Sequence, residues 1–236
     1  MAYRALLFDL SDTLIREIPT QAQHFAERLR LWGFSISEAT ERAIGSCMAE
    51  AAQEQIAWEE QGAPRMDDAD FERLLARAAA ACADADPEAL EGIADFILAA
   101  PPPSTQWVAI PGAVAVLDAL QQRGYRLGVV SNHRAWMRSL LQDMGLAAYF
   151  EQIIISACVG VEKPDPRIME MAVTGLKLSP AECLYIGDHP FDVLCAKRAG
   201  VGCAWIADAA ASLPASVPFC EDYRIQALEE LLTILP

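Results

Sequence analysis

The stretch "LLFDLSDTLI", from Leu6 to Ile15, decides the fold of this chain. Its apolar run ends at Asp9, and a second acid, Asp12, follows three residues later with Ser11 between them. A short apolar run without alternation is typical of a strand that is buried on both faces of a parallel sheet. Such sheets bind their ligands beyond the carboxyl ends of the strands. The stretch therefore makes Asp9 a candidate for the reactive group of an α/β domain.

Further apolar runs predict the rest of this sheet. The expected strands are Arg4–Phe8, Arg126–Val130, Gln152–Ser156, Cys183–Ile186 and Cys203–Ala207. Helical patterns lie between most of these runs, and two of the patterns stop at Gly124 and Gly200, as helices commonly do. Strands without alternation that are separated by helices favour a parallel sheet covered on both faces. The sequence thus predicts an α/β fold.

A long helical segment interrupts this rhythm directly after the first strand. Residues 16–107 show helical patterns and no strand, so we expect an α/β domain formed by residues 1–15 and 108–236 with a helical domain inserted at 16–107. Ser35 and Glu38 fit a capping box that opens a helix reaching Trp58. "GAPRMDD" is expected to be a loop, and "PPPS" (Pro101–Ser104) a stiff linker.

Composition narrows the classes of partner. Hydrophobic residues make up 53% of the 236 residues and the net charge is −15, which favours a packed core and argues against disorder. Only 18 Lys plus Arg are spread along the chain, so nucleic acid and anionic membrane are not expected partners. The N-terminus does not resemble a signal peptide, and the seven cysteines contain no CxxC motif. We expect a cytoplasmic protein, as a monomer or a homodimer.

Four polar groups follow predicted strands: Asp9, Ser131, Lys163 in the next loop, and Asp188. Each alone has an ordinary structural explanation as a turn, cap or surface residue. Lys163 is, however, one of three lysines in the whole chain, and Asp192 stands four residues after Asp188. Two acids at one strand end and one at another can supply the oxygen ligands that Mg²⁺ prefers, and a lysine and a serine nearby can neutralise a phosphoryl group. Together these residues indicate a magnesium and phosphate site.

Four segments, in order along the chain, resemble the motifs of the haloacid dehalogenase (HAD) superfamily. They are "LLFDLSDTL", "LGVVSN", "EKPDP" and "IGDHPFDV". The helical insertion after the first strand is similar to that of members with a helical cap domain. The resemblance implies a Rossmann-like core, hydrolase activity and a cap that closes over the site and contributes to substrate choice.

The resemblance also implies a role for each matching residue. Asp9 would be the nucleophile that forms an aspartyl intermediate, and Lys163 would orient it and offset charge. Magnesium would be held by Asp9, Asp188 and the backbone carbonyl of Ser11, with support from Asp192. The residues expected around the phosphoryl group are Ser11, Asp12, Thr13, Ser131, Asn132 and Lys163.

Ser11 departs from the family pattern. Family phosphatases usually carry an aspartate there, which protonates the leaving group and then activates water. Serine does not titrate near pH 7 and cannot replace it, and general acid–base help is typically worth about 10²–10⁴ in rate. Asp12 occupies a position where the family commonly has glycine, and the sequence leaves open whether it compensates.

Three comparisons within the superfamily bear on the reaction. 2-Haloacid dehalogenases also lack the second aspartate, but they resemble this chain less at "IGDHPFDV" because they need no metal. Phosphonate-cleaving relatives require a cap lysine, and residues 16–107 contain none. Ion-pumping ATPases carry a threonine at the position of Ser11 and form a longer-lived aspartyl phosphate. We therefore expect a magnesium-dependent phosphatase that acts on a small phosphate ester and whose turnover can be slow because Ser11 replaces the acid–base aspartate. The alternatives are a dehalogenase and an impaired member that only binds a phosphorylated ligand.

Overall fold

The computed structural model describes residues 3–61, 66, 68–99, 106–214 and 216–236. Its main element is a six-stranded sheet in the order β5-β4-β1-β6-β7-β8, in which every adjacent pair is parallel. The strands are β1 (Ala5–Phe8), β4 (Arg126–Ser131), β5 (Gln152–Ile155), β6 (Cys183–Gly187), β7 (Gly202–Ile206) and β8 (Tyr223–Ile225). The predicted α/β fold and its five strands are confirmed.

The sixth strand, β8, was not predicted. It has three residues, of which only Ile225 is buried, so it carries no apolar run that a sequence pattern can detect. Edge strands of a sheet are often this short.

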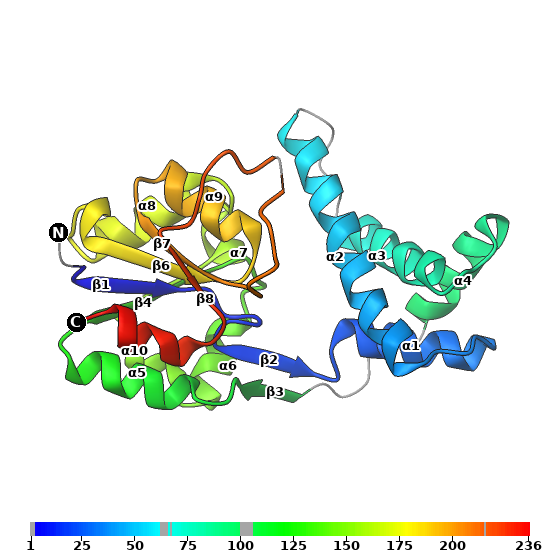
Figure 1. Ribbon diagram of the computed structural model, residues 1–236, viewed down its shortest axis with the longest axis horizontal. Coiled ribbons are helices and arrows are strands. Elements are labelled where there is room, and N and C mark those ends of the chain that lie inside the picture. The colour runs from blue at the N-terminus through cyan, green and yellow to red at the C-terminus, as the bar shows by residue number, and fades with distance from the viewer. Residues whose placement is uncertain (1–2, 62–65, 67, 100–105, 215) are drawn as a thin grey trace. The chain divides into compact units, whose positions relative to one another are not determined.

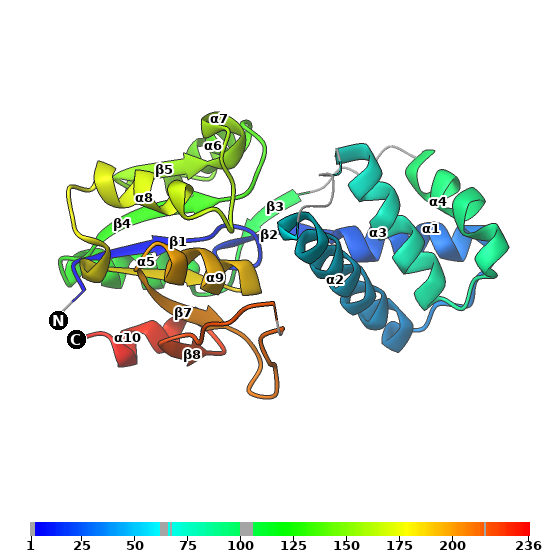
Figure 2. The same ribbon diagram turned by 90° about the horizontal axis from the view of Figure 1, so that it is seen from above.

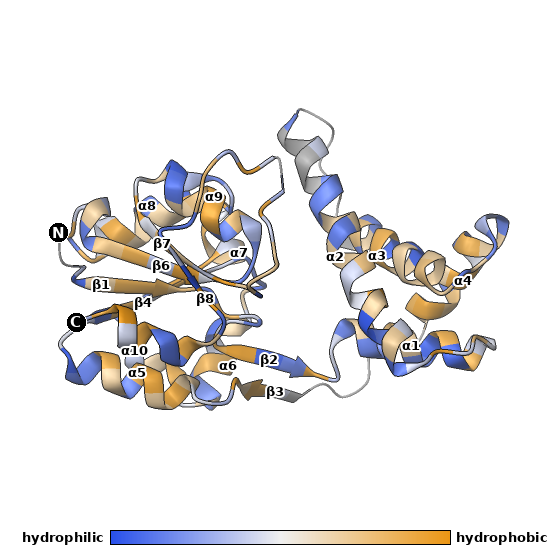
Figure 3. Cartoon of the chain, in the orientation of Figure 1, coloured by the Kyte–Doolittle hydropathy of each residue, from blue (hydrophilic) through white to orange (hydrophobic). Residues whose placement is uncertain are grey.

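Helices cover both faces of the sheet. Figure 1 shows α5 (Ala113–Gln122) and α10 (Leu231–Ile234) on one face and α8 (Pro166–Gly175) and α9 (Pro190–Arg198) on the other. Two further helices, α6 (Met137–Asp143) and α7 (Ser156–Val159), pack against the edge strand β5. All four residues of β1 are buried, and Figure 3 colours this strand as hydrophobic. Double-sided burial explains why its sequence lacks alternation.

The order of the strands brings the ends of three of them together. β1 lies between β4 and β6, with Phe8 opposite Val129 on one side and Ile186 on the other. Parallel strands end at the same edge, so the residues that follow β1, β4 and β6 are neighbours in space. This edge is where the candidate site forms.

The chain divides into two compact units. One contains the chain up to Arg16 and from Val108 onward, and the other is Glu17–Trp107. The second unit consists of the following helices, which Figure 2 shows from above: α1 (Gln21–Trp32), α2 (Glu38–Glu60), α3 (Asp68–Cys82), the 3-10 turn η1 (Pro87–Ala89) and α4 (Leu90–Ala99). It has its own apolar core, which includes Leu29, Ile44, Ala79 and Ile97. Its function as a cap stays a prediction.

Two details of the helical unit differ from expectation. Residues 16–107 contain strand residues, because β2 (Ile15–Ile18) pairs with β3 (Gln106–Ala109) in a separate two-stranded sheet. These short segments flank the helices, and their four-residue length leaves little pattern in the sequence. The predicted capping box at Ser35 is also wrong, because the hydroxyl of Ser37 accepts the backbone N–H of Thr40 at 3.1 Å.

Two predictions concern residues outside the described ranges. The linker "PPPS" falls wholly there, as does most of the loop "GAPRMDD". Within the described residues, none of the helices is both long enough and apolar enough to cross a membrane.

Candidate active site

Asp9 is fixed at the end of the central strand. Its backbone N–H donates to the carbonyl of Ile186 at 2.9 Å, which extends the pairing of β1 with β6 by one residue. The side chain is nearly buried, at 11% exposure. Burial raises the pKa of Asp9, as does the charge of Asp192, while Lys163 and the hydroxyl of Ser131 lower it. Asp9 is thus a buried carboxylate that depends on nearby positive charge.

Lys163 is the cation beside it. Its ammonium lies 2.9 Å from Asp9 Oδ1 and 2.6 Å from Asp192 Oδ1. Burial lowers the pKa of the ammonium, but Asp192 and Asp9 together outweigh this effect and raise it. Lys163 is therefore positively charged at any physiological pH, and a solvated loop position is ruled out by its 5% exposure.

Asn132 holds the backbone of Lys163. Its Oδ1 accepts the Lys163 N–H at 2.7 Å, and its Nδ2 donates to the Lys163 carbonyl at 2.8 Å. Asn132 follows β4, so this pair of bonds attaches the lysine loop to a rigid strand. The sequence placed Asn132 beside the phosphoryl group, whereas its amide is engaged in positioning Lys163. Ser131, the last residue of β4, is buried and lies beside Asp9.

Asp188 directly follows β6, the strand that pairs with β1. Its Oδ1 accepts a hydrogen bond from Thr13 Oγ1 at 2.8 Å, and its backbone carbonyl accepts one from Trp205 Nε1 at 2.8 Å. Burial raises the pKa of Asp188 well above its usual range, and the charges of Asp9 and Asp192 raise it further. Thr13 is fully buried and its hydroxyl orients this carboxylate, and its expected role at the phosphoryl group stays a prediction.

Asp192 is the most enclosed acid of the group. Asp192 lies in the first turn of α9, which follows β6. His189 caps this helix and donates its backbone N–H to Asp192 Oδ2 at 2.9 Å. Burial lowers the pKa of His189, which suits an imidazole whose Nδ1 accepts the Phe191 N–H. Gly187 is required here because a Cβ on it would overlap the Asp192 carboxylate.

Tyr185 belongs to the site and was not predicted. Its ring is fully buried in β6, and its hydroxyl lies 2.9 Å from Lys163 Nζ and 3.1 Å from Asp192 Oδ1. In the sequence it stands inside an apolar run, where an aromatic residue is indistinguishable from ordinary core. The one signal in the sequence is that this buried position carries a tyrosine, whose hydroxyl needs a polar partner, and not a phenylalanine.

Ser11 and Asp12 lie in the turn after Asp9. Ser11 is half-buried and forms a β-bridge with Ile15, and Asp12 is exposed with a φ of 55°. A positive φ favours glycine, so the geometry explains why glycine suits this position. The charge of Asp12 makes the smallest of the contributions that raise the pKa of Asp188. Asp12 lies outside the close carboxylate cluster that the described residues form.

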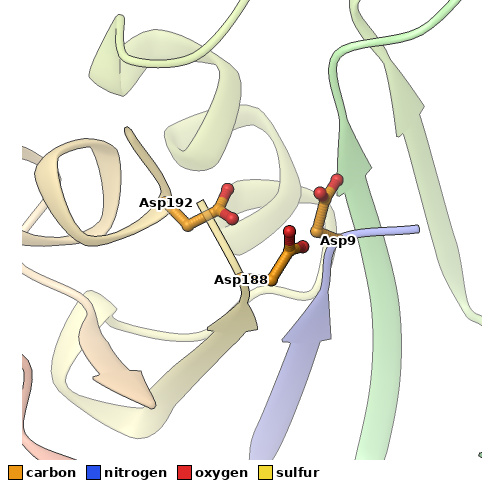
Figure 4. A group of neighbouring side chains, drawn as sticks. All are labelled: Asp9, Asp188 and Asp192. Atoms are coloured by element: carbon orange, nitrogen blue, oxygen red, sulfur yellow. The ribbon is translucent and has the colours of Figure 1, made fainter. Parts of the chain in front are cut away.

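The cluster suits a divalent cation. Oxygen atoms of Asp9, Asp188 and Asp192 lie within 4.8 Å of one another, and Figure 4 shows the three carboxyl groups gathered at the strand ends. Two of the three acids, Asp9 and Asp192, pair with the single ammonium of Lys163, and the ammonium meets Asp9 Oδ1 at 2.9 Å without the geometry of a hydrogen bond. Because both oxygens of Asp192 are bonded within the protein, Asp9 and Asp188 are the better direct ligands. An all-oxygen set of this kind fits Mg²⁺.

Comparisons with known proteins agree with this architecture. A family model described as haloacid dehalogenase-like hydrolase matches residues 3–200. A phosphoglycolate phosphatase of Rhodospirillum rubrum is 31% identical over 201 residues, which cover 84% of this chain and 77% of the relative.

Two solved structures share the fold. The magnesium-bound HAD hydrolase YfnB of Bacillus subtilis aligns with a TM-score of 0.68 at 24% identity, covering 100% of this chain and 99% of that chain. The L-2-haloacid dehalogenase RSc1362 aligns with a TM-score of 0.68 at 18% identity and the same coverage of both chains. At these identities the structures establish the fold alone.

Proposed function

Because this chain belongs to the haloacid dehalogenase-like hydrolases, we propose that it is a magnesium-dependent phosphatase that acts on a small phosphate ester through Asp9. The observation that carries the proposal is the cluster of Asp9, Asp188 and Asp192, in which the buried Asp9 and Asp192 share one lysine. The similarity to a phosphoglycolate phosphatase supports phosphate-ester chemistry and makes phosphoglycolate the first ester to test.

Asp9 and Asp188 would hold the magnesium ion. When bound, such an ion neutralises charge on the transferring phosphoryl group. The rest of the electrostatic stabilisation comes from the chain itself, through the ammonium of Lys163 and the hydroxyl of Ser131 beside Asp9.

In the first step, a carboxylate oxygen of Asp9 forms a bond to phosphorus while the bond from phosphorus to the ester oxygen breaks. The leaving alkoxide must take a proton, and Ser11 cannot donate one as an acid. The step therefore favours esters whose leaving oxygen needs little protonation. In the second step, water attacks phosphorus, the bond to Asp9 breaks, and phosphate leaves. Without a base at position 11, this second step should limit the rate.

The helical unit would act as a cap on this chemistry. It is connected to the α/β unit through two segments, and these segments pair as β2 and β3. Interdomain movement is described for the magnesium-bound YfnB, and closure that excludes water is a common way to protect a reactive intermediate. We expect a phosphate analogue such as a metal fluoride to slow hydrogen exchange in β2 and β3. Unchanged exchange in both strands would contradict a moving cap.

The function itself is tested by a panel of substrates. Phosphoglycolate, other small phosphate esters and 2-haloacids are each assayed with magnesium and with a chelator, and phosphate or halide release is measured. We expect phosphate release that the chelator stops. Halide release at full rate in the chelator would instead support the dehalogenase alternative, which is consistent with Ser11 because dehalogenases also lack the second aspartate. Tight binding of an ester without turnover would support a binding protein.

A further inference from the structure

The hydroxyl of Tyr185 is the starting point. Tyr185 lies in β6 between β1 and β7, and its side chain is fully buried. Its hydroxyl oxygen is 2.8 Å from the carbonyl of Val130, 2.9 Å from Lys163 Nζ and 3.1 Å from Asp192 Oδ1. A phenylalanine would satisfy the packing of a buried strand equally well, so the polar atom requires an explanation.

The hydroxyl has one proton to share among these neighbours. Lys163 donates to the Tyr185 oxygen, so the tyrosine proton goes to one of the two remaining acceptors. The carbonyl of Val130 is the nearer, at 2.8 Å. With the proton there, the oxygens of Tyr185 and Asp192 stand side by side as two acceptors for the ammonium.

An ammonium group has three N–H donors and rotates readily about its last bond. Tyr185 and Asp192 accept two of the three, which leaves the third for Asp9 Oδ1 at 2.9 Å. The direction of that third donor is thus determined by the two fixed acceptors. Its alignment with Asp9 is imperfect in the free protein, and such bonds commonly tighten only when substrate is bound.

Tyr185 also connects this ammonium to the rest of the site. Val130 immediately precedes Ser131, and both belong to β4. The hydroxyl therefore connects β6 to β4 close to the carboxyl ends of both strands, where Asp188 and Ser131 stand.

We propose that Tyr185 is a positioning residue for the hydrolase, which acts through Lys163 by fixing the ammonium so that one N–H faces Asp9. The inference rests on the proposed function, because it concerns the step in which Asp9 attacks phosphorus. The hydroxyl of Tyr185 bonds to Lys163, Asp192 and the Val130 carbonyl, so its effect on Asp9 is through the orientation of Lys163.

The test is Tyr185→Phe, which removes one oxygen and keeps the ring. We expect the rate at which Asp9 is phosphorylated to fall roughly tenfold to a hundredfold, as for the loss of a hydrogen bond to a charged group, whereas kcat falls less because hydrolysis of the aspartyl phosphate limits steady-state turnover. Rapid acid quenching should show that the phosphorylation of Asp9 is slower in a single turnover. A purely structural tyrosine would change the melting temperature without changing that rate.

Tyr149→Phe is the matched control. It removes a hydroxyl from the same unit, where Tyr149 donates to Asp118 at 2.7 Å, and it should leave both kcat and the single-turnover rate unchanged. If Tyr185→Phe does not fold, 3-fluorotyrosine at position 185 keeps the shape and weakens the acceptor oxygen, and it should produce a smaller fall in the same rate.

The outcomes separate the two proposals. An active wild-type protein whose Tyr185→Phe variant, or fluorotyrosine variant, phosphorylates Asp9 at the wild-type rate overturns the role of Tyr185 alone. A wild-type protein that is inactive on every ester overturns the phosphatase proposal, and the positioning role with it.

Discussion

Both units of this chain carry exposed ion pairs, such as Arg126–Glu151 in the α/β unit, but among the described residues the buried ion pairs lie in the α/β unit. In the helical unit, Arg30 pairs with Glu41 and Arg73 with Asp95, each at 2.6 Å, with side chains 25% to 65% exposed. In the α/β unit, Lys163 pairs with Asp9 and Asp192 at similar distances, with no side chain more than 11% exposed. The distances are alike, but the surroundings are not.

Exposure decides what these ion pairs do. Water and salt screen the pairs of the helical unit, so their contribution to stability is small. At the sheet edge the charges have lost their hydration, and each depends on its neighbours. Because the acids there outnumber the single ammonium, the α/β unit retains an attraction for cations that the surface pairs lack. On this difference rests our proposal that the chemistry takes place in the α/β unit.

The largest effect is expected from Asp9→Asn. An amide cannot attack phosphorus, so turnover of the best phosphate ester should fall by at least about 10⁴-fold while the protein stays folded. The control is Asp95→Asn in the helical unit, whose carboxylate pairs only at the surface, and which should keep wild-type turnover. A pure and folded Asp9→Asn variant that turns over the ester at the wild-type rate would show that Asp9 is not the nucleophile.

Removing one partner of the buried pair should cost stability. Lys163→Met leaves the buried acids Asp9 and Asp192 without their cation, which we expect to lower the free energy of unfolding by about 3–5 kcal/mol in metal-free buffer. Arg73→Met in the helical unit should give no resolved change, because its partners are solvated. Urea unfolding of both variants measures the contrast, and equal losses would mean that burial does not distinguish the two units.

Ser11→Asp restores an acid–base group beside Asp9. We expect steady-state turnover of phosphate esters to rise on the order of 10²-fold if that group is the whole deficit. In the wild type, an acyl phosphate on Asp9 should accumulate and be trapped by acid quenching and mass spectrometry. Ser37→Asp keeps a capping residue in the helical unit and should change neither quantity. A fast wild-type rate that Ser11→Asp leaves unaltered would indicate that Asp12 or another group supplies the base.

The smallest effect is a dependence of stability on pH at Asp188. Because burial raises the pKa of Asp188, the folded state binds its proton more tightly than the unfolded state. Without metal, this acid therefore destabilises the fold progressively as pH rises from the ordinary carboxyl pKa near 4 toward the raised value. Asp188→Asn should then have a melting temperature a few degrees higher than the wild type at pH 7 in chelator, and should gain less from magnesium.

The control for this experiment is the exposed Asp208→Asn, which should behave as the wild type does in both buffers. A melting temperature of metal-free Asp188→Asn below that of the wild type would show that Asp188 is stabilised by its hydrogen bond from Thr13 more than it is destabilised by burial.

The sequence predicted the fold better than it predicted the contacts of the site. The α/β class and five strands follow from apolar runs, since burial on both faces leaves an unambiguous pattern. The short strands β2, β3 and β8 were missed because they are brief and partly exposed. The sequence also selected Asp9, Lys163, Asp188 and Asp192, and the structure brings these four residues together.

What the sequence alone determined is which chemical groups stand at the strand ends, because the apolar runs that form the strands are recorded directly in the chain. Only the tertiary structure decided which atoms those groups meet. Thr13 bonds to Asp188 and Asn132 to the backbone of Lys163, and neither partner could be read from the sequence, while their place at a phosphoryl group stays a prediction. Tyr185, hidden in an apolar run, meets an ammonium from a loop 22 residues away. Such contacts depend on the register of parallel strands and on side-chain directions, neither of which has a local signature in the sequence.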